Sequence, residues 1–263
     1  ETEVGMSWTE QRIWLTGGSS GIGLALAEQL LERGARLALS ARREAPLQAL
    51  AERYPGQVLV LPGDLGQESQ VQAIAQAIDA HWGALDMLLC NAGSCEYVEA
   101  GAFQAASIER MLRSNLLSVA YAIEAGLPLL RRGRQAQLVA VGSSVTYLPL
   151  PRAEAYGCSK AGLRYLLQSL RIALASEDIA VTLISPGFVD TPLTQRNDFP
   201  MPMRWTAERA ASEIITRLPA RPLEIRFPGP FISLLRLLGS LPQRWQLAIG
   251  CRLARPVHKE SRP

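Results

Sequence analysis

Residues 16–23 read Thr-Gly-Gly-Ser-Ser-Gly-Ile-Gly, after a short apolar run and before a segment with helical periodicity at 24–33. Strand, glycine-rich turn and helix in this order form the setting in which glycines bind a dinucleotide, with the helix N-terminus facing the phosphates. Gly17 then permits the tight turn, Gly21 lets the backbone approach a pyrophosphate, and Gly23 lets the helix pack close to the sheet. The spacing differs from the commoner G-x-G-x-x-G, so an ordinary glycine-rich turn remains the alternative.

Apolar runs alternate with helical patterns along the rest of the chain. Strands are predicted at 13–16, 36–40, 58–61, 87–90, 137–141 and 180–184, and helices at 22–33, 47–54, 68–81, 108–130 and 153–176. Runs rich in Val, Leu and Ile suit a parallel sheet that is covered on both faces. The alternation predicts a doubly wound, Rossmann-type α/β fold in three layers, in which ligands bind beyond the carboxyl ends of the strands.

The length of 263 residues suits a single α/β domain with a large core. We expect an N-terminal tail at 1–11, whose residues before Met6 are consistent with a vector-derived remnant. One Rossmann-type domain is expected at 12–228. Residues 229–263 are predicted to form a C-terminal amphipathic extension of the same domain.

The composition narrows the class of protein. Hydrophobic residues make up 48% of the chain, but no uninterrupted apolar run is long enough to span a bilayer, and the first residues do not resemble a signal peptide. The net charge of +3 is too small to indicate a nucleic-acid partner. The four cysteines lack C-x-x-C spacing, and we interpret them as free thiols of a cytoplasmic protein.

A tyrosine and a lysine four residues apart, Tyr156 and Lys160, would share one face of a helix. A nearby ammonium group favours the phenolate and lowers the tyrosine pKa toward the range of an acid–base catalyst. The pattern alone is common in helices. A surface lysine that lies over a tyrosine ring is the alternative.

Several short motifs follow one another in order between residues 16 and 191. They are Thr16-Gly17-x-x-x-Gly21-x-Gly23, Asp64-Leu65, Asn91-Ala92-Gly93, Asn115, Ser143, Tyr156-x-x-x-Lys160 and Pro186-Gly187. This ordered set resembles the short-chain dehydrogenase/reductase family, in its short single-domain form. Ser143 stands thirteen residues before Tyr156, which is the spacing of the catalytic serine in that family.

The resemblance implies a role for each member of a catalytic set. Tyr156 would donate a proton to a carbonyl oxygen, and Ser143 would hydrogen-bond the same oxygen as charge develops on it. Lys160 would bind the nicotinamide ribose and lower the pKa of Tyr156. Asn115 would hold a water that links Lys160 to solvent. Considered alone, Ser143 is an ordinary turn serine and Asn115 a polar residue that interrupts a helix.

The resemblance also implies a nicotinamide cofactor, held at the ends of several strands. Asp64 would receive the adenine amino group, Leu65 would pack on the ring, and Val189 and Thr191 would hold the carboxamide. Besides Arg42 and Arg43, the expected contacts are Gly17, Ser19, Ser20, Gly21, Ile22, Gly23, Asp64, Leu65, Asn91, Ala92, Gly93, Tyr156, Lys160, Pro186, Gly187, Val189 and Thr191.

The end of the second predicted strand bears on the choice of cofactor. An NAD enzyme usually places a carboxylate there for the ribose hydroxyls, but no acid occurs until Glu44. Arg42 instead offers a planar cation suited to a 2′-phosphate, and Arg43 would assist it. The sequence therefore favours NADP over NAD, with two solvated arginines as the alternative.

Substrate choice would depend on three loops, at about 94–101, 145–152 and 189–204. Their apolar and aromatic residues suit a hydrophobic carbonyl compound or alcohol, and the alternative is that they anchor the loops in the core. These residues are Tyr97, Tyr147, Leu148, Leu150, Phe188, Phe199, Met201, Met203 and Trp205.

The C-terminal segment departs from the common family ending, which is a strand leading to a glycine-rich end that helps build a tetramer. Here a possible strand at 223–227 is followed by apolar segments that carry Arg236, Arg244 and Arg252. Three alternatives stay open: packing within the molecule or between subunits, contact with a membrane surface, and disorder. We expect a homo-oligomer, and a dimer rather than the common tetramer.

We predict an NADPH-dependent carbonyl reductase, or the reverse alcohol dehydrogenase, that acts on a hydrophobic ketone or secondary alcohol. One alternative is a reductase of a 3-oxoacyl or sphingoid-like ketone, at the inner face of a membrane. Another, of a different class, is a sensor or scaffold that binds NADPH without turnover.

Overall fold

A seven-stranded parallel sheet forms the centre of the protein. The computed structural model describes residues 7–98, 103–196 and 200–254. The sheet has the order β3-β2-β1-β4-β5-β6-β9. Its strands are β1 (Arg12–Thr16), β2 (Arg36–Ser40), β3 (Val58–Val60), β4 (Met87–Cys90), β5 (Gln137–Val141), β6 (Ala180–Pro186) and β9 (Glu224–Phe227). The order reverses between β1 and β4, so the crevice where doubly wound sheets bind ligands opens there.

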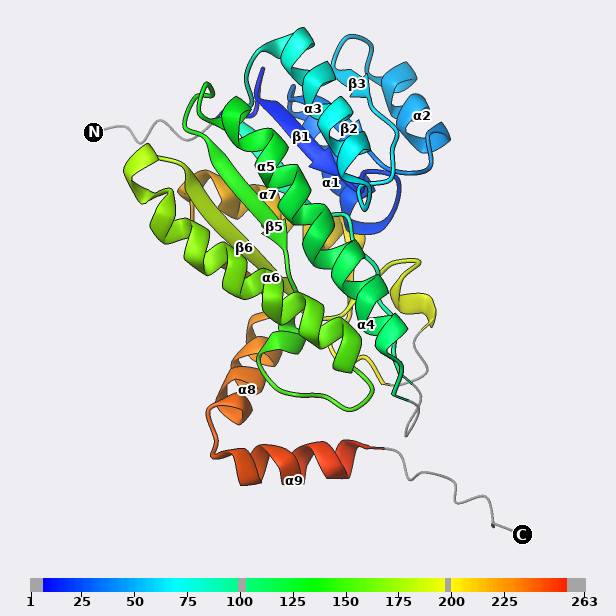
Figure 1. Ribbon diagram of the computed structural model, residues 1–263, viewed down its shortest axis with the longest axis vertical. Helices are drawn as coiled ribbons and strands as arrows, with labels where there is room; N and C mark the ends of the chain where they lie inside the picture. The colour runs from blue at the N-terminus through cyan, green and yellow to red at the C-terminus, as the bar shows by residue number, and fades with distance from the viewer. Residues whose placement is uncertain (1–6, 99–102, 197–199, 255–263) are drawn as a thin grey trace.

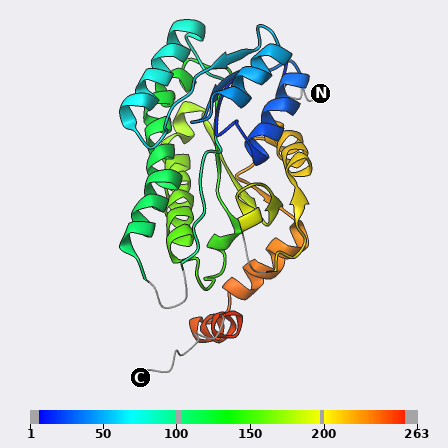
Figure 2. The same ribbon diagram turned by 90° about the vertical axis from the view of Figure 1, so that its right-hand side faces the viewer.

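Helices cover both faces of the sheet, and Figure 2 shows the three layers edge-on. One face carries α1 (Gly21–Glu32), α2 (Ala45–Arg53) and α7 (Ala207–Arg217), and the other carries α3 (Glu68–Trp82), α5 (Ser118–Leu130) and α6 (Glu154–Ala173). Alternate strand residues serve the two layers: Ile13 and Leu15 pack with α1, whereas Trp14 packs with the α3–α5–α6 layer. The predicted fold class is confirmed.

The long helix predicted at 108–130 is confirmed over residues 105–130, but a π-turn interrupts its regular hydrogen bonding. The parts are α4 (Ala105–Leu112), the π-turn Arg113–Leu117, and α5. Asn115 lies in this turn and is fully buried. Such bulges inside a helix occur often at functional sites, because the extra residue moves side chains and carbonyls out of the regular ladder. Periodicity alone does not reveal it, since the apolar pattern continues through the turn.

Helix α7 was not predicted, although the sequence contains its signal. Apolar residues recur with helical spacing at Ala207, Ala210, Ala211, Ile214 and Ile215, and all five are buried. The Thr206 hydroxyl accepts a hydrogen bond from the Arg209 N–H at 3.2 Å and caps the first turn. Just before the helix, β8 (Trp205–Thr206) pairs in parallel with β7 (Val189–Asp190), which ties together the two ends of the predicted substrate loop.

The chain is structured both before β1 and after β9. Trp8 packs against the core and the Glu10 N–H donates to the Gly34 carbonyl at 2.9 Å, so the described part of the predicted tail, residues 7–11, packs on the domain before β1, while residues 1–6 lie outside the described residues. After β9, α8 (Gly229–Gly239) and α9 (Gln243–Leu253) lie at one end of the molecule, below the sheet in Figure 1. None of the helices in the described ranges is both long and apolar enough to cross a membrane.

A buried carboxylate holds two central strands together at their amino ends, opposite the pocket. Asp86, which is 5% exposed, accepts hydrogen bonds from the Arg12 backbone N–H at 3.0 Å, the Arg12 Nη2 at 2.8 Å and the Arg134 N–H at 2.8 Å. Burial alone would raise the pKa of Asp86, but the hydrogen bonds from Arg12 and Arg134 hold that pKa below its usual value. Asp86 therefore joins the starts of β1 and β4, the strands between which the crevice opens.

We expect Asp86→Asn to lower the free energy of unfolding by about 2–4 kcal/mol, because an amide NH₂ would face the Arg12 donors. The pKa of Asp86 is lowered in the folded state, so its contribution is present above the ordinary value of 3.8 and is lost as the pH falls through the lower folded value. Urea unfolding at neutral pH measures the loss.

The matched control is Asp79→Asn, which removes a carboxylate paired with Arg132 where both side chains are about half exposed. That change should cost less than about 1 kcal/mol. Equal losses in the two variants would contradict the role given to Asp86.

Candidate active site

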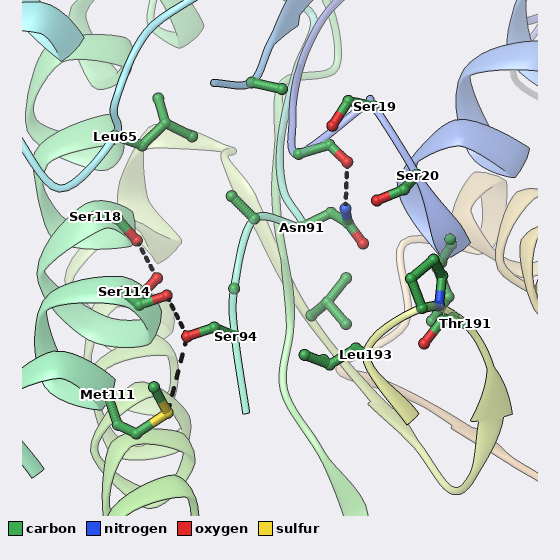
Figure 3. A pocket seen from close by; sticks show the side chains of 18 of the residues that line it. Ser19, Ser20, Leu65, Asn91, Ser94, Met111, Ser114, Ser118, Thr191 and Leu193 are labelled. Atoms are coloured by element: carbon green, nitrogen blue, oxygen red, sulfur yellow. Dashed lines mark hydrogen bonds between the residues drawn. The ribbon is translucent and has the colours of Figure 1, made fainter. Parts of the chain in front are cut away.

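A pocket of about 840 Å³ opens at the carboxyl ends of the strands. Figure 3 shows side chains from the glycine-rich turn, the loop after β4 and the π-turn around it. Most of the predicted cofactor and catalytic residues line this one pocket. They are Gly17, Ser19, Ser20, Gly21, Ile22, Arg42, Arg43, Asp64, Leu65, Asn91, Ala92, Gly93, Ser143, Tyr156, Lys160, Pro186, Gly187, Val189 and Thr191.

The glycine-rich turn is pressed against the end of β4. Gly17 has φ +74°, and a Cβ there would lie 2.7 Å from the Ala92 Cα. The Thr16 hydroxyl accepts the N–H groups of Asn91 and Ala92 at 3.1 Å each, and the Asn91 Nδ2 donates to the Gly17 carbonyl at 3.1 Å (Figure 3). Because any side chain would collide here, glycine is required at position 17.

Gly23 acts behind this turn rather than in the pocket. A Cβ on Gly23 would overlap the Gly17 carbonyl oxygen and the Asn91 Nδ2, so its small size lets α1 approach the turn closely. This is the packing role predicted for it. Gly23 is not among the residues that line the pocket.

The start of α1 is suited to phosphate groups. Ser20 occupies the N-cap position with an extended backbone, but its side chain makes no capping hydrogen bond. Gly21 and Ile22 lie at the pocket wall, so the first-turn N–H groups face open space together with the hydroxyls of Ser19 and Ser20 (Figure 3). Unpaired N–H groups and the positive end of the helix dipole fit a pyrophosphate.

The two arginines after β2 have different surroundings. Both are exposed at the pocket rim. The Arg43 Nη2 donates to the Ser19 carbonyl at 3.1 Å, which fixes Arg43 to the glycine-rich turn. Glu44, the nearest carboxylate in sequence, accepts a hydrogen bond from the Gln48 Nε2 at 3.1 Å along α2. Arg42 is therefore the side chain that the strand end presents to a ligand.

Ser143, Tyr156 and Lys160 meet at the other end of the pocket. Ser143 follows β5, and its hydroxyl accepts the Val145 N–H at 3.2 Å where a 3₁₀ turn begins. Tyr156 and Lys160 lie one turn apart on α6, as predicted, and the Lys160 Nζ is 5.9 Å from the centre of the Tyr156 ring. The Ser143 hydroxyl also lies close enough to the Tyr156 side chain to lower the pKa of its phenol. The three polar groups therefore form one cluster.

The electrostatics of this cluster are dominated by burial. Burial raises the pKa of Tyr156, with a further rise from nearby Cys95, and the Ser143 hydrogen bond lowers it only in part. Burial also lowers the pKa of Lys160 to about 8. The sequence predicts that Lys160 lowers the pKa of Tyr156, whereas the net direction here is upward. The Lys160 Nζ donates to the Val141 carbonyl at 2.8 Å, away from the phenol.

Asn115 lies behind the pocket wall, between the loop after β4 and α6. Its Oδ1 accepts the Ser94 N–H at 2.8 Å, and its Nδ2 donates to the Ser94 carbonyl and to the Ser159 hydroxyl at 2.9 Å each. The side chain is buried and does not line the pocket. It joins the loop after β4 to α6 next to Lys160, and a water held between Asn115 and Lys160 stays a prediction.

Several pocket residues were not predicted. Met111, Ser114 and Ser118 come from α4, the π-turn and α5, and a chain of contacts joins them to Ser94 (Figure 3). The Ser94 Oγ lies 2.9 Å from the Ser114 Oγ, and the Ser118 Oγ donates to the Ser114 carbonyl at 2.7 Å. Met111 stands four residues before Asn115 and Ser118 stands three after it, which is helical spacing. With a site predicted at Asn115, this spacing could have identified both residues from the sequence.

The structure gives a position to several of the apolar and aromatic residues predicted for the substrate loops. Tyr97 lies beside the catalytic cluster, with its ring 6.4 Å from that of Tyr156. Tyr147, Leu148 and Trp205 instead anchor their loops: the Tyr147 hydroxyl donates to Glu224 at 2.6 Å, Leu148 is buried, and Trp205 stacks on Phe227. The pocket interpretation fails for these three, and Phe199 lies outside the described residues.

Comparisons with known proteins agree with this geometry. The family model described as short chain dehydrogenase matches residues 11–200. An uncharacterized oxidoreductase of Myxococcus xanthus is 32% identical over 245 residues, which cover 92% of this chain and 90% of that protein. The 11-beta-hydroxysteroid dehydrogenase-like 3 protein of Arabidopsis thaliana is 35% identical over 187 residues, 69% of this chain and 60% of that protein.

A solved structure is similar as well. The Pseudomonas aeruginosa RhlG/NADP active-site complex has a TM-score of 0.78 and 30% sequence identity, and the match covers 86% of this chain and 98% of that one.

We expect Lys160→Met to raise the free energy of unfolding at pH 7 by about 2 kcal/mol. Burial moves the lysine pKa from 10.5 to about 8, which costs about 3 kcal/mol while the ammonium stays charged, and loss of the Val141 hydrogen bond returns about 1 kcal/mol. Because the folded pKa is the lower one, the cost is relieved as the pH rises from 8 toward 10.5. Urea unfolding at neutral and alkaline pH should show the advantage shrink.

Lys160→Arg is the control, since it keeps a cation in the same place and should not stabilise the protein. The pKa itself is accessible by NMR of lysine-labelled protein, because Lys160 and Lys259 are the only lysines in the sequence. An ordinary lysine pKa for both signals would contradict the burial argument.

Proposed function

The chain belongs to the short-chain dehydrogenase family, and within that family of oxidoreductases we propose that it is an NADPH-dependent reductase of a hydrophobic ketone. The reverse oxidation of a secondary alcohol uses the same groups. The observation that carries the proposal is the cluster of Ser143, Tyr156 and Lys160, which shares one pocket with the uncapped start of α1. A site for phosphates and a proton-donating hydroxyl thus lie at opposite ends of a single cavity.

The residues of the chain divide the work of a reduction. When bound, the reduced nicotinamide supplies hydride to the carbonyl carbon. The Tyr156 hydroxyl donates its proton to the carbonyl oxygen, and the Ser143 hydroxyl hydrogen-bonds the same oxygen as it becomes negative. The high pKa of Tyr156 keeps the phenol protonated before the reaction. Lys160, whose pKa is about 8, carries the positive charge that stabilises the phenolate afterwards.

The preference for NADP is supported by the rim of the pocket. Arg42 is exposed at the rim of the pocket that Ser19 and Ser20 also line, and Glu44 is directed along α2 through Gln48. A guanidinium group binds a 2′-phosphate through two parallel hydrogen bonds, which ribose hydroxyls do not provide. The similar Pseudomonas aeruginosa protein is an NADP complex, which gives a second reason to propose this cofactor.

The hydrophobic character of the substrate is supported by the pocket wall and by relatives. Met111, Leu193 and Val189 contribute apolar surface, and Tyr97 lies beside Tyr156. Plant relatives are named 11-beta-hydroxysteroid dehydrogenases or similar proteins. A large hydrophobic carbonyl compound fits both observations, and a lipid-type ketone remains the second candidate.

The four cysteines, all in the described residues and all unpaired, support a reducing, cytoplasmic setting.

The Arg42→Ala variant should bind NADPH about 10- to 100-fold more weakly, because it loses charge-assisted hydrogen bonds to the 2′-phosphate, while NADH binding stays nearly unchanged. Arg43→Ala should weaken both cofactors, since Arg43 holds the Ser19 carbonyl of the phosphate-binding turn. Fluorescence titration with each cofactor measures the four affinities.

Arg33→Ala removes an exposed arginine at the far end of α1 and should change neither affinity. An equal effect of Arg42→Ala on NADPH and NADH would show that Arg42 does not select the cofactor.

Tyr156→Phe should reduce turnover by at least about 100-fold, in line with loss of a general acid, and should leave NADPH affinity intact. The assay is NADPH oxidation with a panel of hydrophobic ketones, beside a cofactor titration of the same sample.

The matched control is Tyr165→Phe, which removes a hydroxyl from the exposed side of the same helix. Persistent turnover in Tyr156→Phe would exclude Tyr156 as the proton donor. Binding of NADPH without turnover in the wild-type protein would favour the sensor alternative.

A further inference from the structure

Helices α8 and α9 expose several large apolar side chains to solvent. Figures 1 and 2 show both helices at one end of the molecule, with α9 beyond the layered domain. The exposed side chains, all between 53% and 68% exposed, are Leu234, Leu237, Trp245, Leu247 and Leu253. None of the residues of α9, whose whole span is described, is buried. We call these five residues with Arg236, Arg244 and Arg252 the C-terminal surface.

This surface has a definite place in the fold. Helix α8 packs on the domain through Ile232 and Leu235, and a Cβ on Gly239 would overlap the Tyr147 carbonyl. The Gln246 Nε2 donates to the Gly239 and Leu241 carbonyls at 2.9 and 2.8 Å, which fixes the turn between the two helices. The exposed leucines therefore belong to an ordered structure and are not the consequence of a loose tail.

The charge of the surface indicates what would cover it. Arg236, Arg244 and Arg252 are exposed, and the sequence contains no Asp or Glu between residues 225 and 259. All but one of the 24 acidic residues of the chain precede this stretch. A two-fold contact with a second copy would bring arginine against arginine, since symmetry places the same patch on both sides. Cations among leucines and a tryptophan instead complement an anionic, apolar partner.

We propose that the C-terminal surface binds anionic lipid bilayers peripherally. The leucines and Trp245 enter the boundary between headgroups and acyl chains, where tryptophan is favoured in membrane proteins. The arginines extend their charged groups to lipid phosphates and are attracted by the negative surface. Binding of this kind requires no spanning segment, and each of the two helices has only eleven residues.

The surface lies close to the catalytic end of the pocket. The Phe231 ring of α8 packs on Phe188 at 5.6 Å, and its Cδ1 is 3.0 Å from where a Cβ on Gly187 would be. Gly187 lines the pocket. Lipid binding does not depend on the proposed reductase activity, but it would place this pocket beside the phase in which a hydrophobic ketone dissolves.

Sedimentation with lipid vesicles tests the proposal on the full-length protein. The vesicles consist of phosphatidylcholine alone or of phosphatidylcholine with phosphatidylglycerol. We expect binding to the anionic vesicles, weakened by salt, and little binding to the neutral ones. Replacing Arg236, Arg244 and Arg252 together with Gln should weaken binding at least about tenfold, given the contribution of each arginine near an anionic surface.

Two sets of matched variants distinguish binding through the C-terminal surface from an effect of total charge or of exposed hydrophobic area in general. Arg33, Arg53 and Arg132 changed to Gln remove the same charge elsewhere and should keep vesicle binding. The pair Leu237→Gln and Trp245→Gln should abolish it. The pair Tyr165→Gln and Ile172→Gln, at two apolar residues of α6 that are even more exposed, should not.

Absence of vesicle binding by the wild-type protein, or equal loss in the control variants, would overturn the proposal. Sedimentation equilibrium provides the competing outcome: self-association that Leu237→Gln and Trp245→Gln abolish would show that a second copy covers the surface instead. None of these measurements requires turnover, so failure of lipid binding and failure of the reductase assignment are separate results.

Discussion

The close approach of two backbone segments, the turn after β1 and the end of β4, sets the geometry of the whole site. Gly17 and Gly23 allow this approach, and the Thr16 hydroxyl and the Asn91 amide hold it with hydrogen bonds. The turn then leaves the start of α1 uncapped and directed at the pocket. From the end of β4 the chain continues through Gly93 to Ser94, whose N–H donates to the Asn115 Oδ1. A side chain at either glycine would separate these segments and displace both the glycine-rich turn and the loop that supports the cluster of Ser143, Tyr156 and Lys160.

Lys160 shows how the fold uses an unfavourable interaction. The chain contains 27 Lys and Arg residues, of which only Lys160 and Lys259 are lysines. The pKa of a lysine shifts readily on burial, whereas an arginine stays charged. The buried cation of the cluster is a lysine, so it can lose its proton. Burial brings its pKa to about 8, near the range in which proton transfer occurs at neutral pH. Such a cost in stability is typical of active sites.

The two ends of the molecule carry different chemistry. The N-terminal half supplies the phosphate-binding turn and the arginines at the pocket rim, and the acidic residues of the chain are almost all placed before β9 is complete. The C-terminal helices supply leucines, a tryptophan and arginines, and their sequence contains no Asp or Glu. Glu224, at the start of β9, marks the change: it pairs with Arg164 at 2.8 Å and accepts the Tyr147 hydroxyl, and so ties the loop after Ser143 to α6.

The sequence by itself determined the sheet, the doubly wound architecture and most of the pocket, because local periodicity and glycine spacing act over a few residues. Strand ends at Thr16, Cys90 and Val141 fall where the apolar runs stop, and parallel pairing then brings the motifs together. Only the tertiary structure decided that Asn115 lies in a π-turn and that its side chain forms hydrogen bonds with Ser94 and Ser159. The same holds for the burial that raises the pKa of Tyr156 and lowers that of Lys160. Burial and hydrogen-bond partners depend on residues distant in sequence, so no local pattern contains them.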